Sequence, residues 1–356
     1  MRLPAPTLSP MRQPGAVSRT ILAVLWLLLG AAMIGVPVWL GWTRGTTILN
    51  GHPGAVVLGI VTGLLGFVAV AWAIASLVIG GRQDREGDPR QPARRTPAQM
   101  ERRARVRIAL AVPALVLSLL AVVLLFYARP ATAEPQAFAA LHSENGVRVA
   151  DRVTWYELVP SHEDKAGNPI KPTTGLIFLP GARIDPRAYA PELRRLADTG
   201  YLVVVLKEPF GFSIFDRNHA QTVIENHPEI AHWAIGGHSL GGTVAASFAE
   251  QDRRVEGLLL LASYPAQRLE RGDLKVVSIS GDADGLATPA DIERSKANLP
   301  ASTRYVVLPG AAHSTFADYG PQPGDGTPTA DRTAVQTQVA AAAGQLLASL
   351  TPKQTK

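Results

Sequence analysis

The apolar positions of this chain fall into two contrasting patterns. In the first third, three long apolar stretches without a charged side chain cover roughly residues 21–42, 55–80 and 108–127. From about residue 146 onward, apolar runs of three to five residues alternate with segments of helical spacing. The first pattern is typical of membrane-spanning helices, and the second is typical of a globular domain of strands and helices.

The three long stretches predict a membrane anchor. A helix needs about 20 residues to cross a hydrocarbon core of about 30 Å, and each stretch is long enough. The first stretch is too long for the apolar region of a signal peptide, and two similar stretches follow it. We therefore expect residues 1–127 to form three transmembrane helices with the lipid bilayer as their partner. Buried helices of a soluble protein are the alternative.

The distribution of arginines predicts the orientation of this anchor. Three arginines precede the first apolar stretch and nine lie in residues 81–107, whereas the loop at 43–54 carries only Arg44. Positively charged flanks stay on the cytoplasmic side. We therefore expect a multi-pass protein of the cell membrane with a cytoplasmic N-terminus. Three crossings then place the C-terminal domain outside the cytoplasm.

Composition narrows the function further. The net charge of +6 and the pI of about 9.7 come largely from the N-terminus and the arginine-rich loop. That loop lacks the aromatic residues and fold signature of a nucleic-acid site, so we expect no nucleic-acid partner. The chain has no cysteine, which excludes disulfides and a thiol nucleophile. The sequence does not predict an oligomeric state.

The rest of the chain predicts an α/β domain at 146–356, joined to the anchor by a juxtamembrane linker at 128–145. Alternating apolar and polar positions at 146–160 predict an antiparallel edge strand or hairpin. Further short, nearly continuous apolar runs predict parallel strands buried on both faces. They are 176–179, 202–206, 233–235, 258–261, 276–280 and 305–308, with helices expected at 189–199, 243–250, 288–299 and 333–350.

The pentapeptide Gly-His-Ser-Leu-Gly at 237–241 carries the clearest chemical signal. It lies between a predicted strand and a predicted helix, where a sharp turn exposes the hydroxyl of Ser239 to a base and to backbone N–H groups. Such a turn requires small residues two positions before and after the serine. His238 is expected to point away from the chemistry. The pentapeptide alone is also compatible with a simple glycine-rich turn.

Two later segments supply the partners of such a serine. The strand at 276–280 leads into a turn with Asp282 and Asp284, and the strand at 305–308 leads to His313. Carboxyl ends of parallel strands meet at one edge of a sheet, so these side chains converge. His313 would take the proton of Ser239 and return it to the leaving group, and the aspartate would fix the imidazole tautomer. A loop at 320–329 is expected to cover one side of His313.

From about residue 174 to 350 the chain resembles the α/β-hydrolase superfamily, close to its compact, dienelactone-hydrolase-like or lipase-like members. Four stretches carry the resemblance: Phe-Leu-Pro-Gly-Ala at 178–182, Gly-Gly-His-Ser-Leu-Gly-Gly at 236–242, Ile-Ser-Gly-Asp-Ala-Asp at 279–284 and Leu-Pro-Gly-Ala-Ala-His at 308–313. The resemblance implies an α/β-hydrolase fold with a mostly parallel central sheet. It also implies a triad of Ser239, Asp284 and His313, because the family's acid is the third residue after the glycine.

The same fold implies the remaining parts of the site. The backbone N–H groups of Leu240 and Ala182 are expected to form the oxyanion hole. In this loop the chain has Pro180-Gly181 where many members have His-Gly. Only about a dozen residues separate the strands at 258–261 and 276–280, which leaves no room for a helical cap. Phe210, Phe212 and Tyr264 are candidates for an acyl pocket or for ordinary packing.

These features predict a membrane-anchored serine hydrolase that cleaves carboxylic esters of small molecules or lipids through an acyl-enzyme. An acyltransferase with the same triad is one alternative, and a catalytically silent membrane scaffold is another. No His-Glu-x-x-His motif is present, so we expect neither a metal nor another cofactor.

Overall fold

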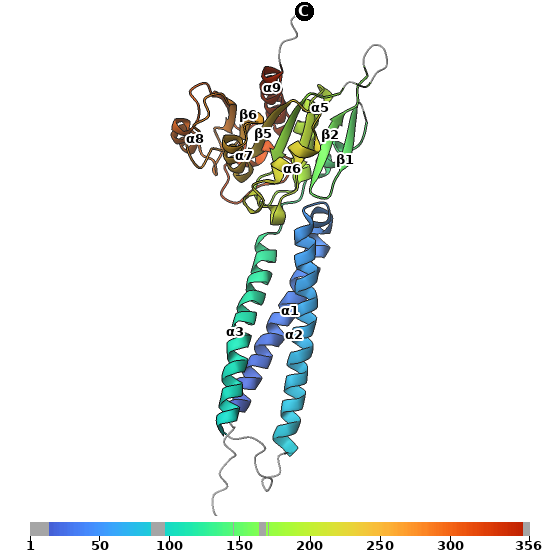
Figure 1. Cartoon of the computed structure of the whole chain (residues 1–356), viewed down its shortest axis with the longest axis vertical. Helices are drawn as coiled ribbons and strands as arrows, with labels where there is room; N and C mark the ends of the chain where they lie inside the picture. The colour runs from blue at the N-terminus through green and yellow to red at the C-terminus, as the bar shows by residue number, and fades with distance from the viewer. Residues whose placement is uncertain (1–13, 87–96, 145, 164–168, 170, 352–356) are drawn as a thin grey trace, which may run out of the picture. The chain divides into compact units, whose positions relative to one another are not determined.

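A computed structural model of the chain describes residues 14–86, 97–144, 146–163, 169 and 171–351 (Figure 1). The described residues form two compact units. The first comprises those up to Thr43 together with Val57–Tyr127, and the second comprises Arg44–Val56 and those from Ala128 onward. Five of the arginines behind the orientation prediction lie outside the described residues, namely Arg2, Arg12, Arg90, Arg94 and Arg95.

The first unit is built from three long helices. They are α1 (Pro14–Leu49), α2 (Pro53–Glu86) and α3 (Pro97–Tyr127). Within them, Arg19–Leu49, Pro53–Ile79 and Arg105–Tyr127 have mean hydropathies of 2.5, 2.4 and 2.9 and are long and apolar enough to cross a membrane. α1 departs from helical geometry at Arg44 (φ −136°), next to the end of the first unit.

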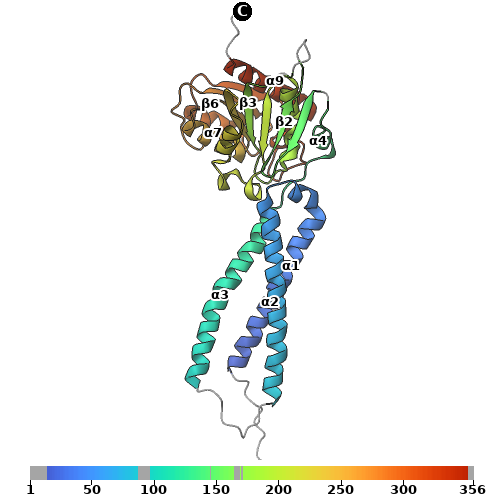
Figure 2. The ribbon, with the colours of Figure 1, turned by 45° about the vertical axis from the view of Figure 1, so that its right-hand side comes forward.

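The second unit is organised around one eight-stranded sheet (Figure 2). The strands are β1 (Val147–Asp151), β2 (Trp155–Pro160), β3 (Thr174–Leu179), β4 (Leu202–Leu206), β5 (His232–His238), β6 (Val255–Leu261), β7 (Lys275–Gly281) and β8 (Arg304–Leu308). Their order across the sheet is β1-β2-β4-β3-β5-β6-β7-β8. The pairs β1–β2 and β2–β4 are antiparallel, and all other neighbours are parallel.

Helices cover both faces of this sheet. They are α4 (Pro135–Ala139), α5 (Ala190–Asp198), α6 (His219–Asn226), α7 (Leu240–Gln251), α8 (Pro289–Ser295) and α9 (Arg332–Leu350). Leu176 and Phe178 of β3 pack with α5 and α9 in one apolar cluster, whereas Ile177 and Leu179 pack with α6 and α7 in the other. The alternation along β3 explains its continuous apolar run, because each face needs its own apolar side chains.

The predicted fold class is confirmed. Each of the six predicted parallel strands is present, and β4 has the bounds that its apolar run predicts. Residues 146–160, expected to form an antiparallel edge strand or a hairpin, form the antiparallel pair β1–β2. The helices α4 and α6 had no counterpart among the predictions, because both are short and lack a long amphipathic repeat.

The segment expected to be a juxtamembrane linker packs against the second unit. Ala131 N–H donates to the carbonyl oxygen of Arg183 at 2.6 Å, and Asp185 N–H donates back to Ala131 at 2.9 Å. Ala133 and Ala137 are buried. Glu134 accepts hydrogen bonds from Gly320 N–H at 3.0 Å and from Arg332 at 2.5 Å. Small alanine side chains allow this close approach. The segment has the composition of a tether, but its residues pack as part of the second unit.

Candidate active site

Ser239 occupies a sharp turn between β5 and α7. Its backbone has φ +53° and ψ −125°, a left-handed region that costs a residue with a side chain about 1–3 kcal/mol. A Cβ atom on Gly237 would lie 2.5 Å from the carbonyl carbon of Gly241, and one on Gly241 would lie 2.2 Å from the carbonyl oxygen of Leu179. The two glycines therefore make the turn possible, as the sequence predicts.

Asp284 and His313 lie together, buried, beyond the ends of β7 and β8. His313 Nδ1 is 2.9 Å from Asp284 Oδ2, and the two residues are 1% and 3% exposed. Asp284 Oδ1 accepts the N–H groups of Leu286 and Ala287, both at 2.8 Å. The carboxylate therefore holds the proton of His313 on Nδ1 and leaves Nε2 as the acceptor.

The other aspartate of this turn lies apart from the histidine. Asp282 is exposed, and its Oδ1 accepts the N–H of Gly310 at 2.6 Å. Of the two aspartates that the turn offers, the structure brings Asp284 to His313. His313 Nε2 is buried and has no hydrogen-bond partner among the described residues. It is free to accept a proton, and hydrogen bonds to a nucleophile often tighten only when substrate is bound.

His238 connects the serine turn to His313. The two imidazole rings have centroids 4.4 Å apart. His238 was expected to point away from the chemistry, and the structure instead places it against the histidine. Burial, followed by the nearby His313, lowers the pKa of His238 well below its ordinary value. A neutral ring therefore packs beside His313.

Tyr189 joins His238 to the loop that follows β3. The Tyr189 hydroxyl lies 2.9 Å from His238 Nδ1 and accepts the N–H of Gly181 at 3.0 Å. Burial raises the pKa of Tyr189 well above its ordinary value, so its hydroxyl keeps its proton. The hydroxyl therefore bridges the N–H of Gly181 and the Nδ1 atom of His238. This chain of contacts fixes the loop after β3 beside the serine turn.

The N–H groups of Leu240 and Ala182 make no hydrogen bond among the described residues. Leu240 is the first residue of α7, where N–H groups have no partner within the helix. The backbone N–H groups on either side of Ala182 already have acceptors. Gly181 N–H donates to the Tyr189 hydroxyl, and Arg183 N–H donates to the carbonyl oxygen of Gly211 at 2.7 Å. The two predicted oxyanion donors thus remain available for a ligand.

Asp325 belongs to the site but was not among the predicted residues. Its carboxylate accepts the N–H groups of His313 at 2.9 Å, Ser314 at 2.8 Å and Gly285 at 3.3 Å, and the hydroxyl of Ser314 at 2.8 Å. Burial opposes ionisation, but these hydrogen bonds outweigh it and lower the pKa of Asp325. Asp325 therefore ties the loop of the base to the loop of the acid.

Only the location of the loop at 320–329 was visible in the sequence. The contacts of Asp325 are to backbone groups, which leave no residue-specific signal. A Cβ atom on Gly326 would lie 1.8 Å from the carbonyl oxygen of Ala283, so the loop packs tightly on the acid turn.

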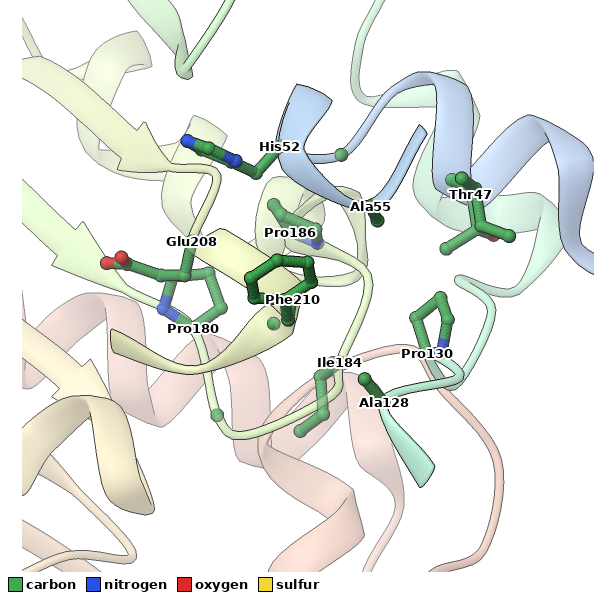
Figure 3. Close-up of a pocket in the computed structure, with 14 residues that line it drawn as sticks. Thr47, His52, Ala55, Ala128, Pro130, Pro180, Ile184, Pro186, Glu208 and Phe210 are labelled. Carbon is green, nitrogen blue, oxygen red and sulfur yellow. The ribbon is translucent and has the colours of Figure 1, made fainter. Parts of the chain in front are cut away.

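The three aromatic pocket candidates have different surroundings. Phe210 lines a cavity of about 50 Å³ beside the loop after β3 (Figure 3). The Phe212 ring packs edge-on against the Phe215 ring, with the ring centroids 5.8 Å apart. The carbonyl oxygen of Tyr264 accepts the hydroxyl of Thr243 at 2.8 Å, and Tyr264 packs against the core. A separate groove of about 330 Å³ begins at Leu240 and follows α7.

Comparison with known proteins agrees with this geometry. Residues 175–337 match the model of the alpha/beta hydrolase family, and this range includes the serine turn, the acid and the histidine. The chain therefore contains an alpha/beta hydrolase domain in this range. No curated protein matches the chain in sequence.

Two solved structures are similar to the chain. A protein from Agrobacterium vitis S4, provisionally described as a hydrolase, is similar over 56% of this chain and 99% of its own, with 14% identity and a TM-score of 0.43. TT1662 from Thermus thermophilus is similar over 56% of this chain and 98% of its own, with 15% identity and a TM-score of 0.41. Neither similarity indicates a substrate.

Proposed function

We propose that this protein is a membrane-anchored serine hydrolase that cleaves carboxylic esters. The observation that carries the proposal is the buried Asp284–His313 pair, in which Oδ2 and Nδ1 are 2.9 Å apart. His313 Nε2 has no partner among the described residues, and the His313 ring packs against His238 of the serine turn. A buried carboxylate–imidazole pair with an unused ring nitrogen is the arrangement that activates a serine hydroxyl.

The proposed reaction has two acyl transfers. Ser239 Oγ attacks the ester carbonyl while its proton moves to His313 Nε2, and Asp284 stabilises the resulting imidazolium. The N–H groups of Leu240 and Ala182 stabilise the oxyanion, each contributing about 3–4 kcal/mol in the transition state. His313 then protonates the departing alcohol. Water, deprotonated by His313, releases the acid from the acyl-enzyme.

The anchor and its orientation are part of the proposal. Three helices with mean hydropathies between 2.4 and 2.9 support membrane insertion. The arginines before the first apolar stretch and between the second and third support a cytoplasmic location of these flanks. With an odd number of spans, the hydrolase unit faces the exterior of the cell or the periplasm.

A fluorophosphonate probe tests nucleophile and orientation together. It should label the full-length protein in intact cells to the same extent as in permeabilised cells, because the serine is activated and faces outward. Ser239→Ala should remove the label. An unlabelled wild-type protein in permeabilised cells would overturn the serine mechanism. Labelling only after permeabilisation would leave the mechanism intact and reverse the orientation.

A further inference from the structure

The hydrolase unit has no cap of its own in the usual position. Only residues 262–274 connect β6 to β7, and the structure places no helix among them. The segment 44–56 comprises the last turns of α1, the connection to α2 and the first turn of α2, and it belongs to the same compact unit as the sheet. The sequence alone predicts no more for it than a short loop.

Specific contacts hold this segment on the hydrolase unit. The guanidinium of Arg44 donates to the hydroxyl of Thr132 at 2.5 Å. A Cβ atom on Gly54 would lie 3.7 Å from Phe210 Cζ, an ordinary van der Waals contact with the turn after β4. Thr47 is 2% exposed. The segment therefore covers part of the unit rather than extending into solvent.

The cavity that Phe210 lines lies between residues 44–56 and the rest of the same unit. Figure 3 shows Phe210 between Pro180 and Glu208 on one side and Ala128 and Pro130 on the other. Most of the lining is apolar and includes Ile48, Ala55, Pro130, Pro180, Ile184 and Phe210. The volume is about 50 Å³.

One wall of this cavity is the loop that carries a predicted oxyanion donor. Pro180 and Gly181 line the cavity, and Ala182 follows them directly. The site that a Cβ atom on Gly241 would occupy is 2.4 Å from the carbonyl oxygen of Pro180, so this loop touches the turn of Ser239. The cavity therefore adjoins the loop of the Ala182 donor, one residue away from it in the chain.

We propose that residues 44–56 act as the cap of this hydrolase and close a pocket for a short acyl group. The inference rests on the proposed ester hydrolysis and names its substrate class: esters of acetyl-sized or propionyl-sized acids. An apolar cavity of about 150 Å³ holds a benzene ring, and a water molecule takes up about 30 Å³. A cavity of about 50 Å³ has room for two or three carbon atoms.

A water molecule is the competing occupant. Thr47 Oγ1 and both carboxyl oxygens of Glu208 are buried without a hydrogen-bond partner among the described residues. Both residues line the cavity. A small cavity with polar atoms in its wall can hold an ordered water. The two occupants differ in one measurable respect, because only an acyl pocket makes the choice of substrate depend on the cavity's size.

The experiment measures kcat/KM of the full-length protein in detergent on p-nitrophenyl acetate, propionate, butyrate and octanoate. The wild-type protein should cleave acetate and propionate best. Ile48→Ala enlarges the pocket and should raise the butyrate-to-acetate ratio about ten-fold, since one methylene in an apolar pocket is worth at least that factor. Ala55→Leu fills the pocket and should lower the propionate-to-acetate ratio. Ile60→Ala, at a 58%-exposed position of α2, is the matched control and should leave both ratios unchanged.

The outcomes separate this inference from the proposed function. If fluorophosphonate labels Ser239 and esters are cleaved, but both pocket variants keep the wild-type ratios, the cap assignment is wrong and ester hydrolysis stands. If neither labelling nor cleavage of any ester is seen, ester hydrolysis fails and the cap assignment fails with it. Opposite shifts in the two variants support the cap, and because one variant removes volume and the other adds it, misfolding cannot produce both.

Discussion

The two compact units use the same apolar residue types in opposite ways. In the long helices, Leu28 and Leu117 are 65% and 66% exposed, and only 11–17% of each apolar span is buried. In the sheet, Leu258 and Leu259 are fully buried. An exposed apolar surface of that extent is typical of a membrane or protein interaction surface, whereas the sheet makes its own apolar interior.

The comparison changes which residues are informative in each unit. In the long helices, an exposed leucine indicates what kind of environment surrounds the helix. In the hydrolase unit, a buried polar group reports a function or a specific structural contact, because burying it without a partner costs free energy. Asp284 pairs with His313 Nδ1, and Asp325 accepts the backbone N–H of His313, whereas His313 Nε2 is left without a partner among the described residues. Changes to buried polar groups of the hydrolase unit should therefore affect catalysis. Changes to exposed apolar groups of the long helices should affect membrane insertion.

The largest effect is expected at the serine and the histidine. Ser239→Ala and His313→Ala should each lower kcat by on the order of 10⁵- to 10⁶-fold, and the double variant should lose little more, because the residues act in one step. Steady-state hydrolysis of a short activated ester measures the loss. Ser247→Ala, on the helix α7 that follows the serine turn, is the matched control. Multiplicative losses in the double variant would show that the two residues do not share a step.

The next largest effect should distinguish the two neighbouring aspartates. Asp284→Asn should lower kcat about 10³- to 10⁴-fold, because an amide favours the wrong imidazole tautomer. Asp282→Asn, at an exposed position that contacts Gly310, should change kcat less than about three-fold. Both variants should retain the native circular dichroism spectrum. A reversed ranking would mean that the acid is Asp282.

A charge on the helices should affect insertion and leave chemistry intact. Leu117→Arg places a charge on an exposed face of α3 at a cost of about 3 kcal/mol, or about 100-fold in the insertion equilibrium. The fraction of protein that resists alkaline extraction from membranes measures it. Leu117→Ala should remain inserted. If Leu117→Arg inserts as well as Leu117→Ala, the exposed face of α3 does not meet lipid.

The smallest of these effects on catalysis is expected at Asp325. Asp325→Asn removes a carboxylate that holds the loops of His313 and Gly285, and should lower kcat about ten-fold with little change in KM. Asp331→Asn, at the N-cap of α9, is the control. The lowered pKa means that the Asp325 contacts are complete above its ordinary pKa of 3.8 and are lost as the pH falls through the lower folded value. An unchanged kcat would show that the loops hold without it.

The parts of the fold that the sequence predicts well depend on local patterns. Buried parallel strands need continuous apolar runs, and the serine turn needs glycines at fixed positions, so β4 and the turn at Ser239 could both be placed from residues alone. The order of acid and base could also be predicted, because the carboxyl ends of parallel strands converge.

The remaining features depend on contacts between distant segments. Ala131 and Ala133 look like a tether in sequence, and their hydrogen bonds are made with Arg183 and Asp185 some fifty residues later. Asp325 binds backbone N–H groups, which every residue except proline carries. The packing of residues 44–56 depends on the shape of the turn at Phe210. No local pattern encodes any of these pairings.

The positive φ of Ser239 makes this residue a point where stability is given up for reactivity. Glycine adopts such a backbone without strain, so Ser239→Gly should increase the free energy of unfolding by about 1 kcal/mol while eliminating hydrolysis. Chemical denaturation beside Ser239→Ala, which keeps the Cβ atom and its strain, would show the difference. The most stable residue for this position is thus one that cannot catalyse. Selection for robustness alone would erode the site, and only a demand for turnover would maintain a serine there.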